Sequence, residues 1–122
     1  MKIRIKGNSV RYRLTRPDVK RLTEKGYLEE HTMFGEKRFE YALQCIEDGD
    51  SLKATFVDNT ITLLVPWSWV EGWETDERVG FSSEMPLTET DNLSLLLEKD
   101  FACLETSTED QADHYDNPNK FC

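Results

Sequence analysis

Apolar and polar residues alternate along much of the chain, with the period of two that is typical of half-buried β-strands. The pattern begins at once, because the first apolar residues alternate with lysines and arginines: Ile3, Ile5, Val10, Tyr12 and Leu14. Gly7-Asn8 interrupts the run and is a turn signal, since both residue types tolerate a positive φ. The opening therefore predicts a β-hairpin with one apolar face and one basic face.

The hairpin is followed by a pattern typical of a capped helix over residues 16–25. Thr15 supplies an N-cap oxygen, and Pro17 and Asp18 are favoured in a first turn. Val19 and Leu22 share one face of this helix, which we expect to be buried. Gly26 is the residue type that most often stops a helix.

Period-two alternation then returns, and it predicts strands over the ranges 27–33, 37–46, 51–57, 78–83 and 93–97. The β-branched, apolar run over residues 60–65 also predicts a strand and is the best candidate for a central one. Turn signals at Gly35, Gly49 and Asp58-Asn59 favour a meander over residues 27–66. Between these strands, Pro66 precedes Trp69, Val70 and Trp73, whose spacing predicts a second short helix over residues 67–75. No internal repeat is visible in the pattern.

These elements predict an α+β fold, with a mainly antiparallel sheet of about seven or eight strands and two short helices. A sheet with so many consecutive strands can curl into a partly open barrel. We expect one domain over residues 1–105. The composition then becomes polar and acidic, which predicts an extended or weakly ordered tail over residues 106–122.

The distribution of charge limits the classes of partner that the chain is expected to bind. The chain has 122 residues and a net charge of −9, yet residues 1–26 hold nine Lys/Arg and only two acidic residues. An acidic protein repels nucleic acid and anionic membranes, so we expect neither as a partner. The chain has no apolar run of 18 residues and opens on charged residues rather than a signal peptide, and its three cysteines are widely spaced. These features favour a cytoplasmic location.

Three stretches carry a resemblance to a known family: the opening MKIRIKGNSVRYRL, the run from Trp73-Glu74-Thr75-Asp76 to Val79-Gly80, and EKDFACL over residues 98–104 with a later Asn117-Pro118. In these the chain resembles a family of short bacterial proteins from the Bacteroidetes that is grouped among the domains of unknown function. The resemblance covers nearly the whole chain. It implies a bacterial cytosolic protein and brings no catalytic residues with it.

The basic face of the hairpin is the first candidate site, formed by Lys2, Arg4, Arg11 and Arg13 together with Lys6. Arginine forks there could bind a phosphate or a carboxylate. The alternatives are a solvated face, or a face covered by acidic residues of the chain itself. The acidic tail is the obvious internal partner, and we expect it to lie against the hairpin.

The second candidate is an aromatic cluster, because Trp67, Trp69 and Trp73 fall within seven residues. Three tryptophans could line a contact site for a partner or sugar. The alternative is that Trp69 and Trp73 anchor the short helix on the sheet, and that Trp67 is half exposed.

The third candidate is a metal or catalytic site that uses Cys103 and His114. These are ligand types that zinc prefers, but their spacing matches no zinc motif, and no nucleophile elbow or phosphate-binding loop occurs. We therefore expect no metal and no cofactor. The sequence favours a non-catalytic binding or protein-interaction module, with a protein partner or a homodimer joined through edge strands. The alternative is a small enzyme or metal-binding protein that uses Cys103, His114 and nearby carboxylates.

Overall fold

The structure is a computed structural model that describes residues 1–101 and residue 115. In this part the chain forms eight strands and two helices: β1 (Lys2–Lys6), β2 (Ser9–Leu14), α1 (Arg16–Lys25), β3 (Tyr27–Phe34), β4 (Lys37–Ile46), β5 (Lys53–Val57), β6 (Thr60–Pro66), α2 (Trp67–Val70), β7 (Gly80–Pro86) and β8 (Asn92–Lys99). The predicted α+β class is confirmed, and the bounds of α1 match the prediction. Most of the predicted tail, residues 106–122, lies outside the described residues.

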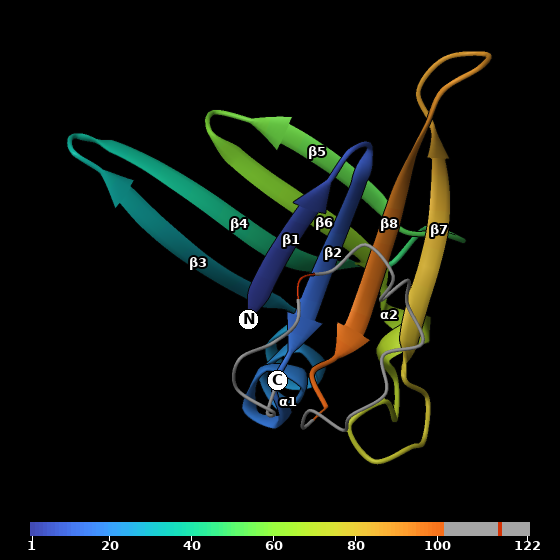
Figure 1. Ribbon diagram of the computed structural model, residues 1–122. Coiled ribbons are helices and arrows are strands. Elements are labelled where there is room, and N and C mark those ends of the chain that lie inside the picture. The colour runs from blue at the N-terminus through green and yellow to red at the C-terminus, as the bar shows by residue number, and fades with distance from the viewer. Residues whose placement is uncertain (102–114, 116–122) are drawn as a thin grey trace.

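The strands form two four-stranded sheets (Figure 1). The first sheet has the order β1-β2-β8-β7 and the second has the order β3-β4-β6-β5. Neighbours within each hairpin are antiparallel, whereas the two inner strands of each sheet, β2 with β8 and β4 with β6, are parallel. Within residues 1–101 the sheets do not join into a closed barrel, although two hydrogen bonds link them: Leu52 N donates to Ser83 Oγ at 2.9 Å, and Tyr41 Oη donates to Met1 O at 3.3 Å.

The predicted meander over residues 27–66 is wrong, because β6 lies beside β4 and leaves β5 at the edge of the sheet. The difference in exposure between β5 and β6 explains this order. Every residue of β6 is buried or half-buried, whereas four of the five residues of β5 are exposed. A strand that is apolar on both faces is stabilised most in the middle of a sheet.

The chain is a structural duplication of one unit, β-β-α-β-β. The first copy is β1-β2-α1-β3-β4, and the second is β5-β6-α2-β7-β8. Each copy contributes its first hairpin to one sheet and its second hairpin to the other, so exchanging the copies converts the strand order of one sheet into that of the other. The expectation that the chain has no internal repeat is therefore wrong at the level of structure.

Equivalent hydrogen bonds confirm that the two copies correspond. Ser94 N donates to Asn8 O at 3.0 Å, and at the equivalent position Glu40 N donates to Asn59 O at 3.0 Å. Three pairs of buried residues also correspond, each pair 51 positions apart: Leu14 with Val65, Val19 with Val70, and Leu22 with Trp73. These pairs share apolar character but not residue type, which is why no repeat is visible in the sequence.

The second helix is shorter than predicted, because α2 ends at Val70 rather than at residue 75. Glu71, the next residue, has φ −58° and ψ 123°, which leaves the helical region, and Gly72 has φ +73°. Glycine carries little cost in that left-handed conformation. Residues 71–75 therefore form turns that place Trp73 in the core.

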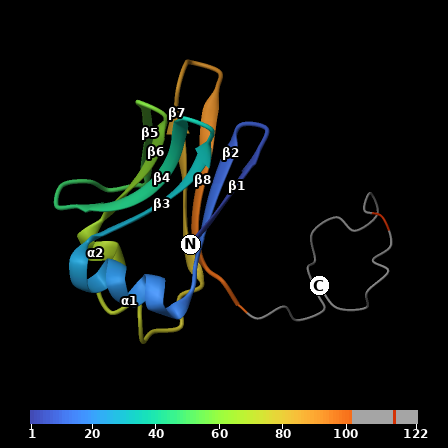
Figure 2. The ribbon, with the colours of Figure 1, turned by 90° about the vertical axis from the view of Figure 1, so that its left-hand side faces the viewer.

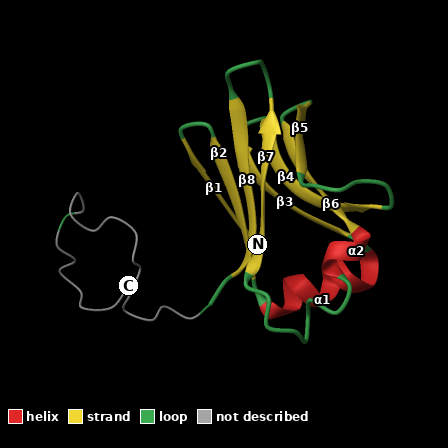
Figure 3. Cartoon of the chain, turned by 90° about the vertical axis from the view of Figure 1, so that its right-hand side faces the viewer, coloured by secondary structure: helices red, strands yellow, loops and turns green. Residues whose placement is uncertain are grey.

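Both helices lie at one end of the two sheets, where they cover the core (Figure 3). Inside, Tyr12 is fully buried and its hydroxyl donates to Ile61 O at 3.0 Å. Toward the opposite end, residues that face the same way as the core remain exposed, among them Ile5 (57%), Phe34 (66%) and Phe56 (70%). The two sheets therefore do not cover each other fully at the end away from the helices.

Candidate functional site

The basic face is the outer face of β1 and β2, and it consists of Lys2, Arg4, Lys6, Arg11 and Arg13. The strand register places Lys2 opposite Arg13, and Arg4 opposite Arg11. Like charges directly opposite each other destabilise a hairpin. The hairpin retains them because its other face, with Tyr12 and Leu14 fully buried, anchors it to the core.

Two carboxylates from the end of β8 and the residue after it neutralise part of the basic face. Glu98 Oε1 lies 3.1 Å from Arg11 Nε, and Asp100 Oδ2 lies 3.0 Å from Lys2 Nζ. Asp100 is placed there by its backbone, because its N–H donates to Leu14 O at 2.7 Å. Two cations of the basic face, Lys2 and Arg11, are therefore paired with carboxylates of the chain itself.

The other three cations of the basic face, Arg4, Lys6 and Arg13, are exposed and form no ion pair with any other residue among 1–101. They lie beside an edge, since β1 pairs with β2 alone in the described sheets and forms the outer strand (Figure 2). The prediction that the acidic tail covers this face concerns residues outside the described part of the chain. The described structure thus presents three positive side chains next to a sheet edge.

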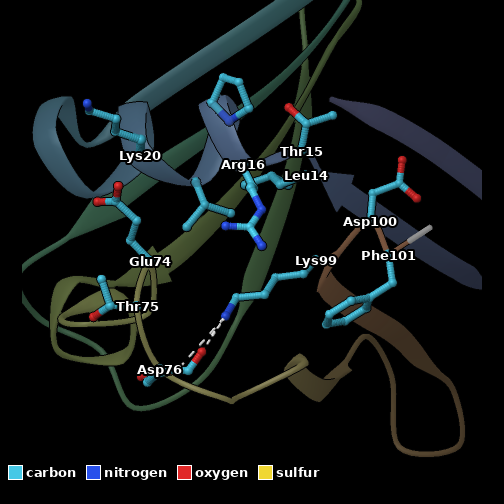
Figure 4. A pocket seen from close by; sticks show the side chains of 12 residues that line it. Leu14, Thr15, Arg16, Lys20, Glu74, Thr75, Asp76, Lys99, Asp100 and Phe101 are labelled. Atoms are coloured by element: carbon cyan, nitrogen blue, oxygen red, sulfur yellow. Dashed lines mark hydrogen bonds and ion pairs between the residues drawn. The ribbon is translucent and has the colours of Figure 1, made fainter.

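A pocket of about 960 Å³ lies at the helix end of the molecule, between the start of α1, residues 74–76 and residues 99–101 (Figure 4). Its wall is apolar at Leu14, Val19 and Phe101 and basic at Arg16 and Lys99. Sequence reasoning missed this pocket, because its three segments are distant in the chain. All three segments stand out in the sequence, as the start of a helix or as stretches of the family resemblance, but none of them carries a ligand-binding motif.

Lys99 is an unusual residue for its position. It lies next to Leu14 on β2, as Cys45 lies next to Val65 in the other copy of the repeated unit. Cys45 is buried there, whereas the Lys99 ammonium donates to Asp76 O at 2.8 Å and lies 5.6 Å from the centre of the Trp73 ring. A cation so placed is stabilised by the ring and by the carbonyl.

The Asp76 carboxylate lies close to two cations, Arg78 and Lys99. Arg78 Nε donates to Asp76 Oδ2 at 2.7 Å, and Lys99 Nζ lies 4.0 Å from Asp76 Oδ1. The hydrogen bond from Arg78 lowers the pKa of the Asp76 carboxyl below its ordinary value. Arg78 also donates to Trp69 O at 2.7 Å and to Glu71 O at 2.9 Å, so it fastens the turns that follow α2.

The three tryptophans pack against the core. Trp73 is fully buried and its indole N–H donates to Arg78 O at 2.8 Å, and the Trp69 ring centre lies 5.4 Å from that of Phe81. Trp67 is partly buried, with its ring against Gly26. This arrangement leaves no exposed row of three aromatic rings for a partner.

Cys103 and His114, the residues named for a metal or catalytic site, lie outside the described residues. Among residues 1–101 and 115 no three His, Cys, Asp or Glu side chains gather as a metal site would require. Burial raises the pKa of the Cys45 thiol to about 11, so this cysteine is poorly suited to act as a nucleophile. In the same part of the chain, no helix is long and apolar enough to cross a membrane.

Fold and surface together define a small duplicated α+β protein whose described part presents a basic face and a separate pocket. The chain belongs to DUF7009, a family of unknown function, whose match covers residues 1–119. The expectation of a family without an established activity is thereby confirmed. Neither the curated proteins nor the solved structures contain a match to this chain.

Proposed function

We propose that this protein is a non-catalytic binding module that recognises an extended acidic segment of a partner protein along β1. One observation carries the proposal: Arg4, Lys6 and Arg13 are exposed beside a sheet edge, and no acid among residues 1–101 forms an ion pair with them. We place this activity in the bacterial cytosol, and the unpaired thiol of Cys45 supports a reducing compartment.

The chemistry of an edge strand explains why the partner would be extended. A peptide that adds to β1 can form backbone hydrogen bonds with the edge, and its alternate side chains then lie on the basic face. Arg4 and Lys6 are two residues apart, so carboxylates at every second position of the peptide would meet them. Arginine binds carboxylates with two parallel hydrogen bonds, which would give Arg4 and Arg13 the larger share of recognition.

The same charges argue against a homodimer through this edge. Pairing β1 with β1 of a second copy would bring Lys2, Arg4 and Lys6 of each copy close to one another. Like charges across a strand pair are destabilising. We therefore favour an acidic partner over a second copy of the chain at β1.

A peptide titration tests the proposal. The probe is a labelled ten-residue peptide with Glu at every second position and Thr between, and fluorescence anisotropy measures its Kd for the full-length protein. Arg4→Gln with Arg13→Gln should weaken binding at least about tenfold, because each charge-assisted hydrogen bond contributes about 1.5–3 kcal/mol. The dependence of Kd on salt should also become shallower.

Arg21→Gln is the matched control, since Arg21 is an exposed arginine on α1, away from the basic face. Its Kd should equal that of the wild type. Equal binding by the Arg4/Arg13 variant, or equal binding of a peptide with Lys in place of Glu, would contradict the proposal.

A further inference from the structure

The pocket at the helix end departs from the pattern of the fold in a way that suggests a ligand. At the equivalent place in the other copy of the repeated unit, the residue on β4 is the buried Cys45, whereas β8 carries Lys99. Conflicts between a residue and its structural environment tend to occur at functional positions. The pocket that Lys99 lines, of about 960 Å³, is at the upper end of the range that accommodates small organic molecules.

The charges of the pocket wall leave one strong anion-binding group free. Two carboxylates that line the pocket already have cationic partners, because Asp76 pairs with Arg78 at 2.6 Å and Asp100 pairs with Lys2 at 3.0 Å. Arg16, in contrast, forms no ion pair within the described residues, and its guanidinium points into the pocket (Figure 4).

Two further charged groups, Lys20 and Glu74, belong to the wall. Lys20 and Glu74 line the opposite side of the pocket (Figure 4). Their charges are opposite, so they add no net charge to that side. The side of Arg16 and Lys99 is therefore the part of the pocket that favours an anion.

Two of the first three residues of α1 have no free backbone donor for this site. Pro17 has no N–H, and the N–H of Asp18 is directed to Thr15 Oγ1 at 3.4 Å. Recognition of an anion would therefore depend on side chains, mainly on Arg16, with the Lys99 ammonium behind it. Guanidinium groups bind carboxylates and phosphates with two hydrogen bonds.

The apolar wall of the pocket indicates which groups the ligand carries besides its anionic head. Leu14, Pro17 and Val19 form one side, and Phe101, which is 59% exposed, forms the rim. A bare inorganic anion would leave this surface exposed to water. A ligand with a ring or chain would bury part of this surface, and burial of apolar surface strengthens binding.

We propose that this pocket binds a small organic anion, with a carboxylate or phosphate head on Arg16 and an apolar body between Pro17 and Phe101. This site is separate from the acidic-segment site proposed on the basic face. Carboxylate and phosphate are both anions that accept two hydrogen bonds from a guanidinium group. Binding of a ligand with either head group supports the proposal, and the comparison shows which head group the pocket prefers.

Chemical-shift titrations of the ¹⁵N-labelled full-length protein test the site. The probes are phenyl phosphate and benzoate, with inorganic phosphate and benzyl alcohol as the isolated halves. At least one of the two intact probes should perturb the amides of Thr15, Asp76 and Phe101. It should bind at least about tenfold more tightly than either isolated half, because only the intact probe uses both walls.

Arg16→Gln should weaken that binding at least about tenfold, whereas Arg21→Gln on the same helix should leave Kd unchanged. Both side chains are exposed, so neither substitution should affect folding, which tryptophan fluorescence checks. The inference is overturned if the perturbed amides lie on β1 and β2 instead, if Arg16→Gln and Arg21→Gln bind equally well, or if no probe binds. None of these results bears on the peptide titration, which uses Arg4 and Arg13.

Discussion

At Gly26 the chain leaves α1 with φ +75°, and its amide donates to Leu22 O at 2.8 Å. The ring of Trp67 lies against the Cα atom, so a Cβ added here would overlap the ring. Gly35 has a similar φ of +63°, but nothing lies within 4 Å of the place where its Cβ would be. An alanine at Gly35 would carry only the cost of backbone strain, whereas an alanine at Gly26 would also clash with Trp67. Comparing the two substitutions therefore separates these costs.

We expect Gly26→Ala to lower the free energy of unfolding by about 2–4 kcal/mol. Roughly 1 kcal/mol comes from the left-handed backbone, and the remainder from displacing Trp67. Gly35→Ala is the control and should cost only about 1 kcal/mol. Urea unfolding followed by tryptophan fluorescence measures both, and equal losses in the two variants would show that Trp67 does not restrict the site.

Among the elements, α1 is the one whose ends are most fully specified. Thr15 Oγ1 accepts from Asp18 N, and the Asp18 carboxylate accepts from Thr15 N at 2.9 Å, which makes a reciprocal capping box. The amine of Met1 adds ion pairs with Asp18 at 2.8 Å and with Glu30 at 2.9 Å. Asp18 therefore joins the start of α1 to Met1, the residue before β1. Through Met1 it is also joined to Glu30 on β3.

The charge of Asp18 should make stability depend on pH. Burial acts to raise the pKa of this carboxyl, but hydrogen bonds from the Met1 amine and from Thr15 outweigh burial and lower it. Because the folded-state pKa lies below the unfolded one, the contribution is complete above pH ~4 and is lost as pH falls through the lowered value.

Asp18→Asn should therefore cost about 1–2 kcal/mol at pH 7 and progressively less toward pH 2, as the wild-type carboxyl becomes protonated. Thermal unfolding measured from pH 2 to pH 7 gives the difference between the two proteins. Glu24→Gln removes an exposed carboxylate from the same helix and should stay within about 0.5 kcal/mol of the wild type. A cost for Asp18→Asn that does not change with pH would exclude the ionic explanation.

For the whole molecule, the duplication means that neither copy of the repeated unit contains a complete sheet. Each copy has one hairpin in the first sheet and one in the second, and the parallel pairs β2 with β8 and β4 with β6 join one copy to the other. Two-stranded hairpins are marginally stable alone in water. The core forms only when both copies are present.

A fragment of residues 1–50 should consequently be unfolded alone, and so should a fragment of residues 51–122. Mixed in equal amounts, they should recover the near-ultraviolet circular dichroism of the intact protein, because Trp73 of the second fragment regains its contacts in the core. The break falls in an exposed loop between β4 and β5, so it removes no strand. Cooperative unfolding of either fragment by itself would contradict this account.

The part of the fold that could be predicted from the sequence is the part encoded by neighbouring residues. Thr15, Pro17, Asp18 and Gly26 mark both ends of α1 within twelve positions, and its observed bounds match the prediction. The hairpin of β1 and β2 also follows from local alternation around Gly7-Asn8, and so does its basic face. Such signals survive in any tertiary context, because they act over a few residues.

Tertiary structure alone decided how the strands are ordered and where the pocket lies. Alternation shows that β6 and β8 have apolar residues, but it does not state which strand each one lies beside, since pairing depends on burial summed over both sheets. The position of Lys99 next to Leu14, 85 residues earlier in the chain, follows from that pairing. The basic face was therefore visible in the sequence, whereas the pocket of Arg16 and Lys99 came into being only when the two copies of the repeated unit packed together.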